Sequence, residues 1–198
     1  MTATRTPASQ RSWPTALVTL ALLVAAACVV TTFVLKPTSP VRSLITKDAA
    51  ARDIGAADGY VGAGSVDVHE DTPALTRLDP DLLAAVRRAS DAAARDGIDL
   101  RVTSGWRSER YQQHLLDEAV AKYGSYAEAR RWVATPQTSQ HVTGQAVDIG
   151  PTDAADWTTR HGDDFGLCQV FANEMWHFEL LTRPGGDCPP MRADGSSG

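Results

Sequence analysis

The chain lacks several features that mark other classes of protein. No block of lysine and arginine occurs in its 198 residues, and the formal net charge is −5, so nothing in the sequence indicates nucleic-acid binding. The motif His-Glu-x-x-His is absent, which excludes the common helical arrangement of zinc proteases, and no internal repeat recurs. Only three cysteines are present, so their placement is more informative than their number.

An uncharged apolar run, residues 15–35, follows a polar tail of residues 1–14. At about 1.5 Å per residue, a helix of this length crosses a bilayer core, so we expect a single transmembrane anchor. A cleaved signal peptide is the main alternative, because residues 25–27 would suit a cleavage site and Cys28 would suit a lipid attached there. A buried helix of a soluble domain is a third, less favoured interpretation. Positive residues flank both ends of the run, so their distribution does not set its orientation.

Residues 36–66 are rich in alanine, glycine, serine, aspartate and proline, which predicts a linker. The folded domain is expected over residues 67–198. Capping residues and apolar periodicity predict helices from Pro80 to a stop near Gly97, over residues 109–123, 126–134 and 153–160, and strands over 98–102, 146–149, 166–171 and 176–180. This order predicts an α+β domain in which a small antiparallel sheet, flanked by helices, carries the functional site.

Two histidines and two acids in the C-terminal half have the chemistry of a zinc site. His141, Asp148 and His177 offer three ligands, and Glu174 offers a base for the attacking water. Apolar residues alternate with Asp148 and with His177, so each is expected on a strand with one face in the core and the ligand on the other. Because Glu174 lies an odd number of residues from His177, the backbone must turn near Met175 if both serve the metal.

Spacing alone does not decide the matter. A lone histidine or aspartate in a strand is more often structural than a metal ligand, and the four residues together favour zinc no more than a structural role. Gly144 lies between His141 and Asp148, where a turn or a close backbone approach would need a residue without a Cβ atom.

Three ordered motifs add a family resemblance. Ser139 to Asp148 fits the pattern S-x-H-x-x-G-x-A-x-D, Glu174 to His177 fits E-x-W-H, and the upstream segment Ser-Gly-Trp-Arg-Ser at residues 104–108 is followed by Gln112. With these motifs, residues 67–188 resemble the VanY-like zinc D-alanyl-D-alanine carboxypeptidases (peptidase family M15). One departure from the family pattern is Met175, which stands where proline is common.

The resemblance implies a Hedgehog/DD-peptidase-like fold and a role for each matching residue. It implies zinc as the cofactor, with His141, Asp148 and His177 as ligands. It makes Glu174 the catalytic base and Arg107 the group that holds the polarised carbonyl oxygen. Two further residues are expected to contact substrate, Ser139 and Gln112, although each would alternatively pack or fix a loop.

The function implied is hydrolysis of the terminal D-Ala from peptidoglycan stem peptides that end in D-Ala-D-Ala. Alternatives on the same site are a D,D-dipeptidase, an L,D-carboxypeptidase, a peptidoglycan endopeptidase, or a non-catalytic zinc-stabilised module that binds the cell wall. The sequence lacks S-x-x-K, so a serine mechanism of the penicillin-binding type is unsupported. Such a substrate places the C-terminal domain outside the cytoplasm, either on a membrane anchor or released or lipid-bound after cleavage.

The cysteines give a separate expectation. Cys28 falls in the apolar run, which leaves Cys168 and Cys188 as the pair in the outer domain. An oxidising compartment would permit a disulfide between them, with two free buried thiols as the alternative.

Overall fold

The computed structural model describes residues 54–197. The predicted tail 1–14, the apolar run 15–35 and the linker up to residue 53 lie outside this part of the chain. Within residues 54–197, the helices are all too short or too polar to cross a membrane.

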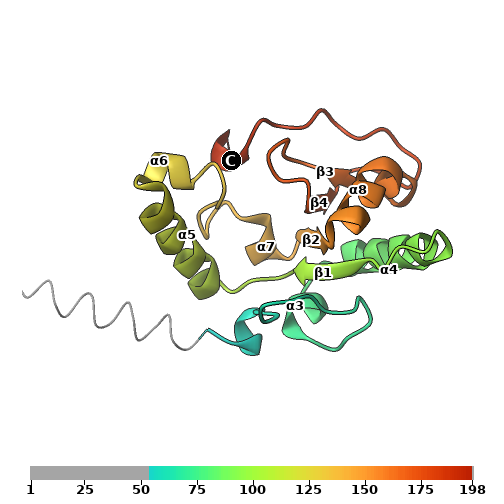
Figure 1. Cartoon of the computed structure of the whole chain (residues 1–198), viewed down its shortest axis with the longest axis horizontal. Helices are drawn as coiled ribbons and strands as arrows, with labels where there is room; N and C mark the ends of the chain where they lie inside the picture. The colour runs from blue at the N-terminus through green and yellow to red at the C-terminus, as the bar shows by residue number, and fades with distance from the viewer. Residues whose placement is uncertain (1–53, 198) are drawn as a thin grey trace, which may run out of the picture. The chain divides into compact units, whose positions relative to one another are not determined.

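A four-stranded sheet forms the centre of the domain, and its strands are antiparallel throughout (Figure 1). The strand order is β1-β2-β4-β3, so the two central strands are the ones that carry Asp148 and His177. This confirms the expected small antiparallel sheet. The strands are β1 (Arg101–Ser104), β2 (Ala146–Gly150), β3 (Leu167–Gln169) and β4 (His177–Leu180).

The alternation of side chains along β2 and β4 separates a core from a site. Val147, Ile149 and Phe178 are buried in the main hydrophobic core, whereas Asp148 and His177 face the other way. Two helices cover the core face, α4 (Pro80–Arg95) and α8 (Thr152–His161). The predicted strand pattern is therefore confirmed, except that Trp176 precedes β4 and is 40% exposed instead of lying in the core.

Local sequence signals fix most helix ends. The carboxylate of Asp79 accepts hydrogen bonds from the backbone of α4, whose Pro80 takes the first helical position. Helix α5 (Glu109–Tyr123) has the predicted bounds, with Ser108 as its N-cap and Gly124 in a left-handed conformation at its end. The remaining helices are η1 (Ala56–Asp58), α3 (Pro73–Thr76), α6 (Tyr126–Ala129), α7 (Gln140–Thr143), η2 (Gly162–Phe165) and η3 (Gly195–Ser197).

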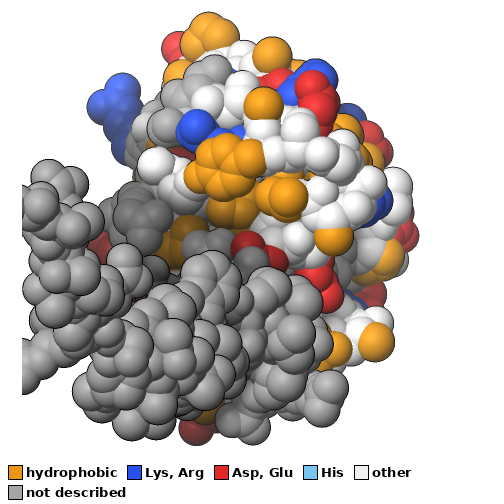
Figure 2. All heavy atoms as spheres, turned by 90° about the vertical axis from the view of Figure 1, so that its left-hand side faces the viewer, with side chains coloured by type: hydrophobic (Ala, Val, Ile, Leu, Met, Phe, Trp, Pro, Cys, Tyr) orange, Lys and Arg blue, Asp and Glu red, His pale blue; other side chains and the backbone are white. Residues whose placement is uncertain are grey.

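Helix α6 is shorter than the predicted 126–134. Beyond Ala129 the carbonyl oxygen of Arg131 accepts hydrogen bonds from Asn173 and Gly195, far along the chain. The helix itself gives way to tighter turns, in which Arg131 N–H bonds to Glu128 and Trp132 N–H bonds to Ala129. Helices α5 and α6 share a small core of their own, and Figure 2, which faces this end of the domain, shows hydrophobic side chains at its surface. Exposed aromatic residues of this region are Tyr126 and Trp132.

Three further boundaries differ from expectation. The strand predicted at 98–102 begins only at Arg101, because the backbone of Ile98 still bonds to the end of α4. The strand predicted at 166–171 is shorter in the structure, where β3 covers only Leu167–Gln169. The folded domain also begins before residue 67: Val66 pairs with Val102 of β1, and Asp58 hydrogen-bonds to Ser108. Residues 55–66 thus belong to the domain and not to a linker.

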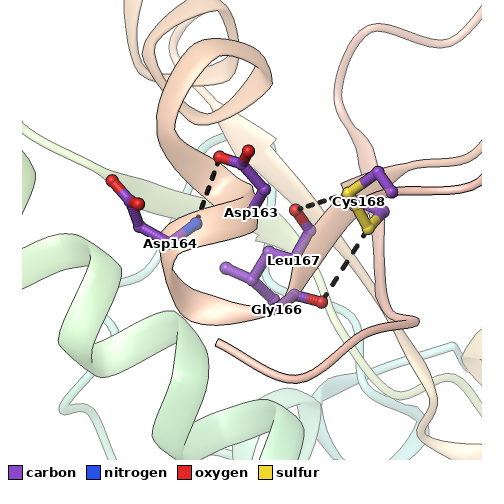
Figure 3. The surroundings of a disulfide bond; sticks show 6 residues. Asp163, Asp164, Gly166, Leu167 and Cys168 are labelled. Carbon is purple, nitrogen blue, oxygen red and sulfur yellow. Dashed lines mark hydrogen bonds between the residues drawn. A yellow bond between two sulfur atoms is a disulfide. The ribbon is translucent and has the colours of Figure 1, made fainter. Parts of the chain in front are cut away.

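The expected disulfide between Cys168 and Cys188 is present. The two Cα atoms lie 5.6 Å apart, and the bond lies beside the backbone of Gly166 and Leu167 at the start of β3 (Figure 3). It fastens the C-terminal segment to the edge strand of the sheet.

Candidate metal centre and active site

The three predicted metal ligands meet at one point in the buried floor of a pocket. His141 Nε2, Asp148 Oδ1 and His177 Nδ1 are each 3.3 Å from the other two atoms. The pairing of Asp148 with His177 across β2 and β4 brings two of these side chains together, and α7 supplies the third. Within residues 54–197 these three residues form the only cluster with the geometry of a metal site.

The triangle fits zinc. Ligand atoms about 2.0–2.1 Å from a tetrahedral zinc ion lie about 3.3–3.4 Å from one another, which matches the spacing of the three atoms. Two imidazoles and one carboxylate are also a donor set that zinc accepts in catalytic sites, where a fourth position stays open. The three side chains therefore fit zinc, the cofactor that the family resemblance implies.

Hydrogen bonds on the far side of each imidazole fix its orientation. His141 Nδ1 donates to the carbonyl oxygen of Gly105 at 2.8 Å, which leaves Nε2 as the atom that faces the triangle. His177 Nε2 donates to Glu179 at 3.2 Å, which leaves Nδ1 for the triangle. Partners of this kind hold a metal-binding histidine in the correct tautomer. Glu179 is thus the residue that orients His177.

The electrostatics of the triangle favour a cation at its centre. Although burial disfavours its charge, His141, His177 and Arg107 hold the pKa of Asp148 well below its usual range. Burial and the neighbouring Arg107 lower the pKa of His141, which keeps this imidazole neutral and able to bind a metal. Burial opposes charge at His177 as well, but hydrogen bonds with Asp148 and Glu179 raise its pKa to about 9.

Glu174 lies beside the triangle. Its carboxylate is 4.0 Å from His177 Nδ1, and the residue lines the pocket although it is only 8% exposed. The predicted turn is present: the backbone of Glu174 bonds to Phe171, and that of His177 bonds back to Glu174. Burial raises the pKa of Glu174 to about 7. A carboxyl group with such a pKa exchanges protons readily near neutral pH.

Arg107 reaches the pocket from the loop after β1, but its guanidinium already has protein partners. It donates to Asp148 at 2.7 Å, to the hydroxyl of Ser104 at 2.7 Å and to the side chain of Gln112 at 3.2 Å. Arg107 therefore braces Asp148 of the triangle, and its predicted contact with the substrate carbonyl stays a prediction.

The side chains of Gln112 and Ser139 differ in their hydrogen bonding. Gln112 is 1% exposed, accepts from Arg107 and donates to the carbonyl oxygen of Ala134, which favours a packing and positioning role over substrate contact. Ser139 lines the pocket, and its hydroxyl has no hydrogen-bond partner among residues 54–197. That hydroxyl is available to a substrate. Gly144 ends α7 with φ +77°, and a Cβ atom there would lie 2.5 Å from the carbonyl oxygen of Arg77.

Sequence reasoning missed three contributors to the site. The hydroxyl of Ser104 and the carbonyl oxygen of Gly105 hold Arg107 and His141, although both lie inside the recognised Ser-Gly-Trp-Arg-Ser segment. That segment was a usable signal. Arg192 also lines the pocket, and no local pattern around it indicates a site.

Comparison with known proteins finds D-alanyl-D-alanine carboxypeptidases, and one relative that is also a D-Ala-D-Ala dipeptidase. A model of the VanY family, described as D-alanyl-D-alanine carboxypeptidase, matches residues 75–183. A D-alanyl-D-alanine carboxypeptidase of Enterococcus faecalis is 32% identical over 130 residues, or 53% of this chain and 48% of the relative. The chain thus spans about half the length of the curated relatives that it matches first.

Two solved structures are similar to this chain in fold, with nearly equal TM-scores and identities. VanYB in complex with D-alanine-D-alanine has a TM-score of 0.51 and 29% identity, covering 53% of this chain and 72% of that one. A mutant of the vancomycin-resistance D,D-pentapeptidase VanY, in complex with Zn(II), has a TM-score of 0.50 and 29% identity, covering 53% and 73%.

Proposed function

Because the chain belongs to the VanY family of D-alanyl-D-alanine carboxypeptidases, we propose that it hydrolyses the terminal D-Ala from peptidoglycan stem peptides ending in D-Ala-D-Ala. The observation that carries this proposal is the buried triangle of His141, Asp148 and His177 with Glu174 beside it in an open pocket. A structural metal site would need no carboxyl group poised beside it. For that reason the arrangement favours an enzyme over a zinc-stabilised binding module.

His141, Asp148 and His177 would hold the zinc ion. When bound, zinc supplies a positive centre that polarises the scissile carbonyl and makes the attacking water more acidic. Glu174 accepts the proton of this water as its oxygen bonds to the carbonyl carbon, and then donates the proton to the departing nitrogen of D-Ala as the C–N bond breaks. Arg107 keeps Asp148 in place, and we expect its positive charge to stabilise the charge that develops on the carbonyl oxygen.

A peptide assay tests this proposal and separates it from the alternatives. The full chain with zinc should release free D-Ala from N-acetyl-L-Lys-D-Ala-D-Ala, detected by mass spectrometry, and should leave the matched L-Ala-L-Ala peptide intact. A chelator should abolish release, and added zinc should restore it. Release of the intact dipeptide, or cleavage only of peptides with a single D-Ala or of cross-linked fragments, would assign a related peptidase activity instead. Zinc binding without any hydrolysis would leave only the binding module.

We also propose that residues 15–35 anchor the chain in the cell membrane, with the catalytic domain outside the cytoplasm. The apolar run supports the anchor, and the disulfide between Cys168 and Cys188 supports an oxidising compartment. The intact mass of the protein from its native membrane fraction tests this: an N-terminus that retains residues 15–35 is expected. An N-terminus at or near Cys28 would show cleavage of a signal peptide or attachment of a lipid.

A further inference from the structure

The last part of the described chain returns to the pocket, beyond the residues that match the family model. We call residues 188–196 the C-terminal strap. At its start, Cys188 is bonded to Cys168 of β3 (Figure 3). Near its end, the carboxylate of Asp194 accepts a hydrogen bond from Arg131 at 2.8 Å. These two attachments, on opposite sides of the strap's midpoint, hold it against the domain.

Backbone pairing fixes the middle of the strap. The N–H of Arg192 donates to the carbonyl oxygen of Val170 at 2.9 Å, and the N–H of Ala172 donates to that of Arg192 at 2.8 Å. This parallel bridge places Arg192 beside Phe171, between β3 and the turn that carries Glu174. The strap therefore supplies part of the pocket wall, and Arg192 lines the same pocket as the metal triangle.

The side chain of Arg192 is linked to the metal site through one aromatic ring. Its guanidinium carbon lies 4.7 Å from the centre of the Phe171 ring. The Phe171 ring lies 5.1 Å, centre to centre, from the imidazole of His177. An aromatic face orients a guanidinium without using any of its N–H donors. Those donors stay available to a ligand in the pocket.

The positive charge of Arg192 is also not paired with an acidic side chain in the described part of the chain. The other arginine of the pocket, Arg107, is paired with Asp148, whereas Arg192 has no hydrogen bond or ion pair from its side chain to any of residues 54–197. The carboxylates of Glu174 and Glu179 line the same pocket and would repel an anionic substrate. A cation on the wall offsets this repulsion and attracts negative groups.

We propose that Arg192 is a specificity-determining residue that binds a carboxylate of the peptide substrate. A guanidinium presents paired N–H donors that match a carboxylate, and the Phe171 ring holds it ready for such a contact. The inference rests on the proposed function, because it assumes a peptide with a free acid group. Two groups have this chemistry: the terminal carboxylate of D-Ala, and an acidic side group on the acyl side of the scissile bond.

Binding measurements test the role of Arg192 apart from turnover. The protein used is the full chain with zinc bound and with the change Glu174→Gln. Calorimetry gives the Kd of this protein for acetyl-γ-D-Glu-L-Lys-D-Ala-D-Ala, with and without the further change Arg192→Gln. Loss of a charged hydrogen bond should weaken binding by about 10-fold or more. Arg192→Lys should keep part of the affinity, because it keeps the charge but not the fork. High salt should shrink the difference, since the site is exposed.

Peptide variants distinguish the two carboxylates. If the effect of Arg192→Gln disappears with a C-terminal amide, the terminal carboxylate is the partner. If it disappears only when the D-Glu α-carboxylate is an amide, the acyl-side acid is the partner. Equal weakening for every peptide, or none for any, would overturn the proposal. Arg160→Gln, which removes an arginine of α8 outside the pocket, is the matched control and should leave Kd unchanged.

These Kd values, together with hydrolysis assays of the wild-type chain and of Arg192→Gln, separate this inference from the proposed function. Arg192-dependent binding together with a wild-type chain that hydrolyses no peptide would contradict the proposed function alone. Normal hydrolysis, with a KM that does not respond to Arg192→Gln, would contradict the role of Arg192 alone.

Discussion

The floor of the pocket and its outer wall are built in different ways. The floor comes from the two central strands, α7 and the turn before β4, and its polar side chains are nearly closed to solvent: His141 and His177 are each 5% exposed and Asp148 is 6% exposed. Each of these side chains has several fixed partners. The wall comes from the loop after α6 and from the C-terminal strap, with Trp132 39% exposed and Arg192 exposed.

The floor and the wall therefore have different functions. A buried floor whose three metal-site side chains have fixed partners cannot adapt to different ligands, but it can hold reacting groups in a fixed geometry. An exposed wall tied down at a few points contributes little to that geometry and can contact the variable parts of a substrate. Changes to the floor should therefore remove the reaction, whereas changes to the wall should alter apparent affinity or stability and leave the reaction possible.

The largest effect is expected from a change to the floor itself. His177→Ala removes one of three metal ligands and leaves Asp148 and Glu179 without their shared partner. Both zinc content and peptide hydrolysis should be lost, as measured by elemental analysis and by release of D-Ala. His69→Ala changes an exposed histidine outside the pocket and should alter neither. Full zinc content in a folded His177→Ala protein would show that the triangle is not the metal site.

Glu174→Gln should separate chemistry from metal binding within the floor. The amide keeps the shape of the side chain but cannot accept the proton, so turnover should fall by about 10²-fold or more. Zinc content should stay at the wild-type level, because Glu174 is not one of the three ligands. Glu118→Gln on α5 is the control. Hydrolysis at the wild-type rate by Glu174→Gln would sink the proposed mechanism, and loss of zinc would make Glu174 a ligand.

Removal of the disulfide tests whether the wall can loosen while the floor stays intact. The bond closes a loop with a sequence separation of 20, and the chain-entropy model gives about 3 kcal/mol of stability for such a loop. Changing both Cys168 and Cys188 to serine should lower the free energy of unfolding by about that amount, measured with urea. Zinc content should not change, and KM should rise more than kcat falls. A folded double variant that no longer binds zinc would contradict the division between floor and wall.

The smallest effect is expected outside the pocket, where Asp58 hydrogen-bonds to Ser108, the residue after Arg107. Burial opposes its charge, but hydrogen bonds with Arg110, Ser108 and the backbone of Gly55 lower the pKa of Asp58 below its usual value. A lowered pKa stabilises the fold above the unfolded pKa of about 3.9, and this contribution is lost as pH falls through the folded value.

Asp58→Asn should therefore cost about 1 kcal/mol near pH 7, because it weakens the charge-assisted hydrogen bonds from Arg110 and Ser108. The difference from wild type should vanish in acid, where wild-type Asp58 is protonated. Urea unfolding across a pH series measures it, with the exposed Asp91→Asn on α4 as control. A difference that stays constant with pH would show that the hydrogen-bonding shape of Asp58 matters and its charge does not.

Features that depend on neighbouring residues could be predicted from the sequence. Ser108 and Gly124 set both ends of α5 because a cap and a left-handed glycine act within one helical turn. The period of two around Asp148 and His177 fixed which face of each strand holds a ligand. The motif spacing then brought three ligands and Glu174 together, and the structure confirms their convergence.

Features that depend on distant segments could not be predicted. After Ala129, where α6 ends early, Asn173 and Gly195 bond to the carbonyl oxygen of Arg131, and no residue near α6 indicates those bonds. In the same way, Asp58 bonds to Ser108, fifty positions away, and Arg192 reaches the pocket through pairing beside β3. The composition of residues 36–66 predicts a linker, whereas long-range bonds to Val102 and Ser108 order the chain within residues 55–66.

The bridge between Val66 and Val102 has a consequence for how the protein behaves at high concentration. Val66 bonds to the outer side of β1, and the strap bonds to the outer side of the chain that extends β3, so each edge of the sheet is partly covered by backbone from elsewhere. Open strand edges are templates on which another chain can add itself. Both covers come from segments that flank the family-matched residues. A version trimmed to residues 75–183 would bare these edges, so we expect it to aggregate even where its zinc ligands are intact.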